Sequence, residues 1–391
     1  MKVKSKSTVI AAGFAMFSMF FGAGNVIFPL AVGSAAKGQN FYAIAGLLIS
    51  AVGIPLLGLI SMTLFNGNYK HYFERIGKVP GFLLALFIMG LIGPFGAMPR
   101  LITVSHSTFS MYWPGVPFTL FSLISCALVF LLTFKKNSLV DILGYYLTPA
   151  LLVALVIIIV KGLVSAPAMP ATDFDPQTLF YDGLVTGYEM MDLLATFFFS
   201  SIVLQCLEAT EIAEGHTKNF RNVIFLTLKA SLIGMGLLAV IYIGFSYVAA
   251  FHSDVLVGLG REHLLGAIAL HILGPYAGIV AIMAVSLACL TTAIALAAVF
   301  SEFLHNDLTQ GKLPYIPSLV ITLIVCYFVS TLGFSGIARF LEPILVVCYP
   351  ALIVLTIFNI GHKLSHVKMV KTPFAIATVA SLANYLYLTY G

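Results

Sequence analysis

Long apolar runs separated by short polar connections follow one another along almost the whole chain. They cover residues 8–36, 40–65, 81–112, 116–134, 139–164, 184–207, 222–251, 274–305, 314–332, 336–360 and 372–390. An α-helix rises about 1.5 Å per residue and the hydrocarbon core of a bilayer is about 30 Å thick, so a run of roughly 20 apolar residues spans it. The pattern therefore predicts an all-α polytopic membrane protein with eleven helical spans.

Composition and charge agree with that class. Hydrophobic residues make up 60% of the 391 residues and charged residues only 9%. With the N-terminus inside, fourteen lysines and arginines fall in inner connections and three in outer ones, which is the bias that the positive-inside rule describes. The N-terminus is therefore expected in the cytoplasm. The net charge of +5 then reflects contact with anionic membrane lipid, and it gives no reason to expect nucleic acid as a partner.

The first apolar run is interrupted near its middle by Gly22, Ala23, Gly24 and Asn25. Counted from Thr8 at about 1.5 Å per residue, the glycines lie about 21 Å along, inside the bilayer. Unpaired backbone groups survive there only against protein or a cavity, so a break predicts a bound ligand. The N-terminus of the helix that follows favours an anion or carboxylate. The alternative is an intact helix whose small residues pack on a neighbour.

The sixth run opens the second half of the chain as the first run opens the first half. Its residues Phe197, Phe198 and Phe199 are followed by Ser200 and Ser201, which puts hydroxyls at a depth where they need partners. Five spans separate the two starts, so the halves enter the membrane from opposite sides, as an inverted repeat requires. The alternative is an ordinary helix whose serines bond back to their own backbone.

The eighth run carries two hydroxyls that share a helix face with Ala288. Thr291 and Thr292 follow Ala288 at spacings of i+3 and i+4. Hard cations prefer oxygen ligands, and uncharged hydroxyls with backbone carbonyls suit Na⁺ better than Ca²⁺ or Mg²⁺. The alternative is that both hydroxyls bond to their own helix.

Several classes of activity lack their residues. The chain has no Walker-type glycine-rich loop, no HExxH and no nucleophile elbow, which argues against ATP-driven transport and hydrolase chemistry and hence against an enzyme. No organic cofactor and no obligate protein partner are implied. The five cysteines lie in apolar runs without CxxC spacing and are expected to be packing residues. A channel would need a continuous polar lining, which these spans do not offer.

Three stretches resemble the motifs of one family. Residues 17–30, FSMFFGAGNVIFPL, look like the first-helix signature of the bacterial branched-chain amino-acid/sodium symporters, and residues 93–100 and 187–195 resemble their third-helix and sixth-helix motifs. This family is similar to carriers with the LeuT-type 5+5 inverted repeat, in which helices one and six are broken. The resemblance implies a bacterial cytoplasmic (inner) membrane protein with repeats over residues 1–183 and 184–360 and an eleventh helix over 361–391.

The resemblance also implies two sites. A coupling Na⁺ would lie between helices one and eight, at the carbonyls of Ser18 and Phe21 and at Ala288, Thr291 and Thr292. The carboxylate of an amino-acid substrate would meet the amides of Ala23 and Gly24, and its ammonium would meet freed carbonyls near Phe20, Phe199 and Ser200. The full set of expected substrate residues is Phe20, Gly22, Ala23, Gly24, Asn25, Phe199, Ser200 and Ser201.

The expected function is symport of Na⁺ with leucine, isoleucine, valine or methionine by alternating access. Burial of each CH₂ of the substrate contributes roughly 0.8 kcal/mol, which favours aliphatic side chains over polar ones. The alternative is a proton-coupled carrier of another neutral amino acid. Charged residues toward the outer ends of spans could close an outer gate or could simply reach the lipid headgroups; they are Arg100, Glu189, Asp192, Arg339 and Glu342.

Overall fold

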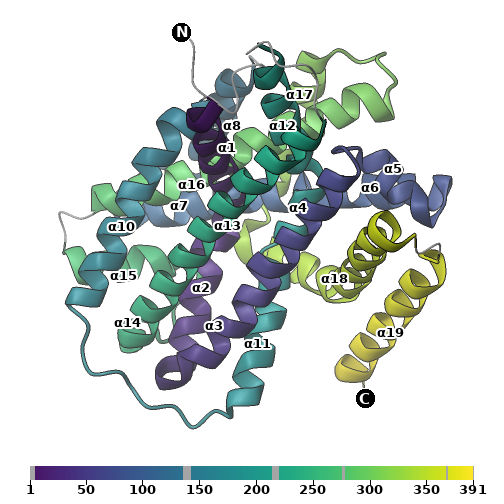
Figure 1. Cartoon of the computed structure of the whole chain (residues 1–391). Coiled ribbons are helices and arrows are strands. Elements are labelled where there is room, and N and C mark those ends of the chain that lie inside the picture. Colours follow the sequence, from purple (N-terminus) through teal and green to yellow (C-terminus); the bar gives the residue numbers. More distant parts are fainter. Residues whose placement is uncertain (1–4, 135–141, 214–219, 275–277, 367–368, 391) are drawn as a thin grey trace.

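The computed structural model describes residues 5–134, 142–213, 220–274, 278–366 and 369–390 (Figure 1). Residues 139–141 of the expected run 139–164 and residues 275–277 of the expected run 274–305 therefore lie outside the described residues. Every regular element in the described part of the chain is helical, which confirms the all-α prediction. Seven described stretches are long and apolar enough to cross a membrane, and three shorter apolar helices accompany them. Together they account for the first ten predicted spans.

The first five spans form the first repeat. Each of the first three spans consists of two helices: α1 (Ser5–Phe20) and α2 (Ala23–Ala36) in the first, α3 (Asn40–Leu48) and α4 (Ile54–Leu64) in the second, and α6 (Lys78–Ile92) and α7 (Ala97–Ser110) in the third. The fourth span contains α8 (Phe118–Thr133), and the fifth contains α10 (Thr148–Val164). A π-helical turn, η2 (Ile49–Gly53), connects α3 to α4. The short helix α5 (Tyr69–Phe73) lies between the second and third spans.

The next five spans form the second repeat, and the eleventh helix follows them. The bounds are α11 (Pro176–Glu189) and α12 (Asp192–Ala213), α13 (Phe220–Phe251), α16 (Gly278–Phe303), α17 (Tyr315–Ser330), α18 (Gly333–Ser365) and α19 (Lys371–Tyr390). The short helices α14 (Ser253–Leu256) and α15 (Leu264–Leu273) connect the seventh span to the eighth. Figure 1 shows α19 packed beside α18 at one side of the molecule. Helix α19 is not among the stretches apolar enough to be assigned as a span.

The predicted break of the first span is confirmed. Helix α1 ends at Phe20, and α2 begins at Ala23 after Gly22, which is extended with φ −111° and ψ −155°. The side-chain Oδ1 of Asn25 accepts a hydrogen bond of 3.0 Å from the amide of Gly22. This is one half of a capping box, in which the third helical residue reaches back to the N-cap amide. Asn25 therefore fixes where the second half-helix starts.

The break of the sixth span lies earlier than expected. Helix α11 begins at Pro176 and ends at Glu189, and α12 starts at Asp192. Met191 between them has a positive φ of 66°, a left-handed conformation that is uncommon for a residue other than glycine. The prediction of freed carbonyls near Phe199 and Ser200 is wrong, because α12 is wound without interruption through both.

The third span has a break that the periodicity did not predict. Helix α6 ends at Ile92 and α7 begins at Ala97, with Gly93, Pro94, Phe95 and Gly96 between them. Pro94 has no N–H to continue the helix. A Cβ built at Gly96 would lie 2.2 Å from the carbonyl oxygen of Leu91, so this turn needs glycine for space.

Glycines bring α11 and α3 into direct backbone contact. A Cβ at Gly183 would lie 2.0 Å from the carbonyl oxygen of Ala43, and one at Gly46 would lie 2.1 Å from that of Phe180. Gly187 follows Gly183 at the GxxxG spacing, and a Cβ there would lie 1.9 Å from Oγ of Ser50. Small residues let membrane helices approach closely and gain van der Waals contact, so these two half-helices are packed as a unit.

Candidate functional site

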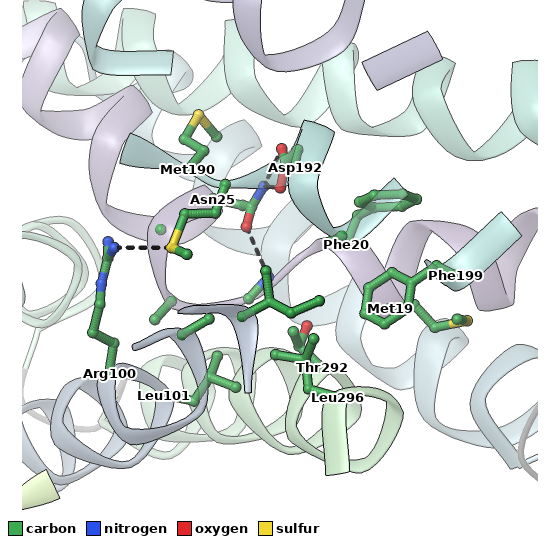
Figure 2. A pocket seen from close by; sticks show the side chains of 17 residues that line it. Met19, Phe20, Asn25, Arg100, Leu101, Met190, Asp192, Phe199, Thr292 and Leu296 are labelled. Atoms are coloured by element: carbon green, nitrogen blue, oxygen red, sulfur yellow. Dashed lines mark hydrogen bonds between the residues drawn. The ribbon is translucent and has the colours of Figure 1, made fainter. Parts of the chain in front are cut away.

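The three helix breaks meet around one cavity (Figure 2). Its walls come from both halves of the first and third spans, from the turn and second half of the sixth span, and from α16. The apolar part of the lining includes Met19, Phe20, Leu101, Phe199 and Leu296. The rings of Phe20 and Phe199 pack edge to face with centroids 5.3 Å apart. The polar part is at the helix breaks, where backbone and side-chain groups reach the same space.

One polar group of the cavity is the N-terminus of α2. Gly22, Ala23, Gly24 and Asn25 all line the cavity. In the described part of the chain the amides of Ala23, Gly24 and Asn25 donate to no backbone or side-chain acceptor, as expected for the first turn of a helix. Free amides and the positive end of the helix dipole together favour an anion. The predicted carboxylate position is therefore geometrically available.

The second polar group is the carboxylate of Asp192, the first residue of α12. Asp192 is 2% exposed. Its Oδ1 and Oδ2 accept from Nδ2 of Asn25 at 3.1 and 2.8 Å, and Oδ2 also accepts from the hydroxyl of Tyr242 on α13 at 3.3 Å. Nδ2 of Asn25 contacts the Tyr242 hydroxyl as well. Figure 2 shows Asn25 and Asp192 facing each other across the two breaks.

This position of Asp192 corrects the expectation that it lies toward the outer end of a span. Because the sixth span is broken at Met190 and Met191, its second half starts at the cavity, and Asp192 is carried there with it. Sequence reasoning missed Asp192 as a cavity residue. The available signal was a carboxylate inside a membrane span, which marks a functional site by default.

The oxygen atoms expected around a cation come together beside the cavity. The hydroxyls of Thr291 and Thr292 donate to the carbonyl of Ser18 at 2.9 and 3.1 Å, and Thr291 also donates to the carbonyl of Ala288 at 3.0 Å. Two carbonyls and two hydroxyls without a carboxylate fit a monovalent hard cation. No group of three or more His, Cys, Asp or Glu that could hold another metal occurs in the described residues.

Phe21, the fifth expected ion-site residue, lies in the break between α1 and α2. Its ring stacks on that of Phe17 with centroids 5.1 Å apart and lies near Tyr242. No hydrogen bond between Phe21 and either threonine occurs in the described residues. The geometry thus brings Ser18, Thr291 and Thr292 together directly and leaves the carbonyl of Phe21 as a prediction.

The two serines of the sixth span do not line the cavity. Ser201 donates to the carbonyl of Phe198 at 2.6 Å, which is the backbone bonding of the alternative interpretation. Ser200 is fully buried and its Oγ has no hydrogen-bond partner in the described residues. Of the expected sixth-span residues only Phe199 faces the cavity.

Three charged side chains cluster next to the cavity. Arg100 on α7 is buried, donates to the backbone carbonyl of Glu189 at 3.2 Å, and stacks over the rings of Phe28 and Phe334. The carboxylate of Glu189 pairs with Arg261 of the loop before α15 at 2.9 Å. Arg261 was not among the gate candidates. It links that loop to α11, so this cluster has the composition that a gate would need.

Two other gate candidates form no ion pair with this cluster in the described residues. Arg339 and Glu342 on α18 are exposed, and no ion pair involves either of them in the described residues. Their exposure fits the interpretation that they reach the headgroups.

The fold is shared with known carriers. The structure of MhsT in complex with L-phenylalanine superposes with a TM-score of 0.63, covering 96% of this chain and 98% of that chain at 13% identity. An inward-facing structure of Mhp1 gives a TM-score of 0.58, with 98% and 89% coverage and 15% identity. At these identities the likeness establishes the LeuT-type architecture and nothing further.

Sequence comparison identifies the family. The branched-chain amino acid permease BrnQ of Bacillus subtilis is 30% identical over 93% of this chain and 83% of its own length. BrnQ of Corynebacterium glutamicum is 31% identical over 92% and 82%, and BrnQ of Escherichia coli is 29% identical over 92% and 81%. These relatives are permeases rather than enzymes. The family described as "Branched-chain amino acid transport protein" matches residues 5–389, and the chain belongs to this family.

Proposed function

We propose that this protein carries leucine, isoleucine or valine into the cell together with Na⁺ by alternating access. The cytoplasmic membrane of a bacterium, with the N-terminus inside, is the location that fits the loop charges and the bacterial relatives. The single observation that carries the proposal is the junction of the first and eighth spans. There an oxygen-lined site at Ser18, Thr291 and Thr292 adjoins the free amides of α2.

The substrate carboxylate would bind at the amides of Ala23 and Gly24. Both residues line the cavity and their amides have no acceptor in the described residues, so binding would require little rearrangement of the backbone. The ion would bind one helix turn earlier, with the carbonyl of Ser18 and the threonine hydroxyls as ligands. For this the hydroxyls of Thr291 and Thr292 would turn their lone pairs toward the cation rather than donating to Ser18.

The apolar wall supports selection of an aliphatic side chain. Met19, Leu101, Phe199 and Leu296 face the space beyond the polar groups. Burying each CH₂ there contributes roughly 0.8 kcal/mol, whereas burying an unpaired polar group costs about 1–3 kcal/mol. Leucine should therefore be preferred to serine or glutamate, while the differences among leucine, isoleucine, valine and methionine should be small.

Coupling between ion and amino acid follows from their shared wall. A Cβ built at Gly22 would lie 3.1 Å from Oγ1 of Thr292 and 2.9 Å from Leu101, so only the peptide of Gly22 separates the two sites. Occupancy of one site would order the backbone that forms the other. By linkage, each ligand would then raise the affinity for the other by the same factor.

The test is uptake of labelled leucine into proteoliposomes with one imposed gradient at a time. We expect an inward Na⁺ gradient to drive accumulation and a proton gradient without Na⁺ to drive none. Unlabelled isoleucine and valine should compete, and serine and glutamate should not. Accumulation driven by protons alone would refute Na⁺ coupling in favour of the proton-coupled alternative. Equal competition by serine would refute the proposed selectivity.

A further inference from the structure

Asp192 is a buried carboxylate that no basic side chain neutralises. It is 2% exposed, lines the cavity, and forms no ion pair in the described residues. In the part of the chain that the structure describes, its two oxygens accept hydrogen bonds only from Asn25 and Tyr242, which are neutral groups. A buried charge is costly unless it is paired, so Asp192 in its ionised form calls for a positively charged ligand.

The nearby basic residue does not supply that charge. Arg100 also lines the cavity, but its Nη1 donates to the carbonyl of Glu189 and to the sulfur of Met191, and its guanidinium lies over two aromatic rings. Figure 2 shows the Arg100 head on the side of Met190, away from Asp192. Arg100 is therefore held through Nη1 and its aromatic neighbours, whereas its buried Nη2 has no hydrogen-bond partner in the described residues.

The hydrogen-bond count leaves room for a donor. A carboxylate offers about four lone-pair sites, and the bonds from Asn25 and Tyr242 occupy three of them. Of the other acceptors expected for an ammonium, the carbonyls of Phe199 and Ser200 lie inside the continuous helix α12, and the carbonyl of Phe20 at the end of α1 accepts from the amide of Gly22 at 2.8 Å. The lone pairs of the two α12 carbonyls are directed along that helix to amides four residues on. Among the acceptors that line the cavity in the described residues, Asp192 is the one that carries a carboxylate.

We propose that the carboxylate of Asp192 binds the α-ammonium group of the transported amino acid. The ammonium would donate to Asp192 at the start of α12, while the carboxylate of the same molecule accepts from Ala23 and Gly24 at the start of α2. Two broken helices would then hold the two opposite charges of one zwitterion. Asn25 positions both ends, since its Oδ1 fixes the Gly22 amide and its Nδ2 fixes Asp192.

This inference rests on the proposed function, and it makes that function more specific. The site would require an α-amino group, not merely an aliphatic chain with a carboxylate. The 2-hydroxy and 2-oxo acids with the carbon skeleton of leucine would be rejected, because they would leave the Asp192 carboxylate buried without a counter-charge. The ratio of affinities for leucine and for its 2-hydroxy analogue therefore reports on this contact.

The experiment measures that ratio in purified full-length protein at saturating Na⁺. Equilibrium binding of leucine and of its 2-hydroxy analogue is compared in the wild type, in Asp192→Asn, and in Asp254→Asn, a matched control at an exposed position of α14. We expect the wild type and Asp254→Asn to prefer leucine strongly. Asp192→Asn should lose about tenfold to hundredfold in leucine affinity, the range for a charge-assisted hydrogen bond, with less than a threefold change for the hydroxy acid.

Each other outcome overturns the assignment. Equal losses for both ligands, or an unchanged leucine affinity, would mean that Asp192 does not contact the ammonium. An unchanged affinity ratio, with a higher half-saturating Na⁺ concentration when leucine binding is repeated over a series of Na⁺ concentrations, would show that Asp192 serves the ion instead. If Asp192→Asn does not fold, the wild type still decides, because competition by the hydroxy acid as strong as that by leucine refutes the proposal. A wild type that binds no branched-chain amino acid would refute the proposed function itself.

Discussion

Replacing Thr292 by valine should weaken Na⁺ activation without disturbing the fold. Valine has nearly the shape of threonine and lacks only the hydroxyl. In the structure the Thr292 hydroxyl donates to the carbonyl of Ser18 at 3.1 Å, but the hydroxyl of Thr291 donates to the same carbonyl at 2.9 Å. The carbonyl therefore keeps a partner in Thr292→Val, and the methyl contact with Gly22 is retained.

The expected size of the effect on Na⁺ activation follows from the loss of the hydroxyl dipole of residue 292, which would face the Na⁺ charge. Interactions of this kind contribute about 1.5–3 kcal/mol, and each 1.4 kcal/mol corresponds to about tenfold in a binding constant. The half-saturating Na⁺ concentration should therefore rise by about tenfold to hundredfold. Because the two ligands are linked, leucine affinity at low, fixed Na⁺ should fall by a similar factor and recover at high Na⁺.

The assay is leucine uptake into proteoliposomes over a series of Na⁺ concentrations. Thr292→Ser serves as the matched control, because it keeps the hydroxyl and loses only the methyl group. We expect this variant to stay within a few fold of the wild type. An unchanged Na⁺ dependence in Thr292→Val, or an equal shift in both variants, would remove Thr292 from the ion site.

Two further predictions concern packing and the charged cluster. Gly183→Ala should lower the midpoint of thermal unfolding, because its Cβ would collide with a backbone carbonyl and overpacking costs typically 1–3 kcal/mol. Gly236→Ala is the control, since a Cβ there meets nothing within 4 Å, and it should leave the midpoint equal or higher. The reverse order of the two midpoints would refute the packing argument. Arg261→Gln removes a half-exposed ion pair with Glu189 worth about 0.2–1 kcal/mol, so hydrogen exchange of residues 261–273 should accelerate by up to about fivefold, and no change would show that the pair does not hold the loop.

Local sequence signals predicted the first break but not the exact place of the second. Gly22 and Gly24 with Asn25 form a recognisable interruption, and the structure breaks there. The sixth span turns at Met191 with a positive φ, a conformation for which methionine gives no signal. Tertiary contacts hold it there, among them the bond from Arg100 to the carbonyl of Glu189. Such contacts between distant spans cannot be read from periodicity.

The candidate site shows the same division. The hydroxyls of Thr291 and Thr292 share one face by helical geometry alone, and they indeed meet the first span. Asp192 was expected toward an outer end because its depth depends on where the sixth helix is interrupted. Its partners Asn25 and Tyr242 come from two other spans, which no local pattern could bring together.

The glycine contacts between α11 and α3 determine which parts of the molecule can shift relative to each other. Sliding one of these half-helices along the other would drive the carbonyl of Ala43 against the backbone of Gly183, so the two would move together as one rigid body. Any bending of the backbone would then occur at the ends of this helix pair, at the turn through Met191 and at the π-helical turn η2. The turn through Met191 lies directly before Asp192, so a tilt of the α11–α3 pair would move the start of α12 and with it the carboxylate.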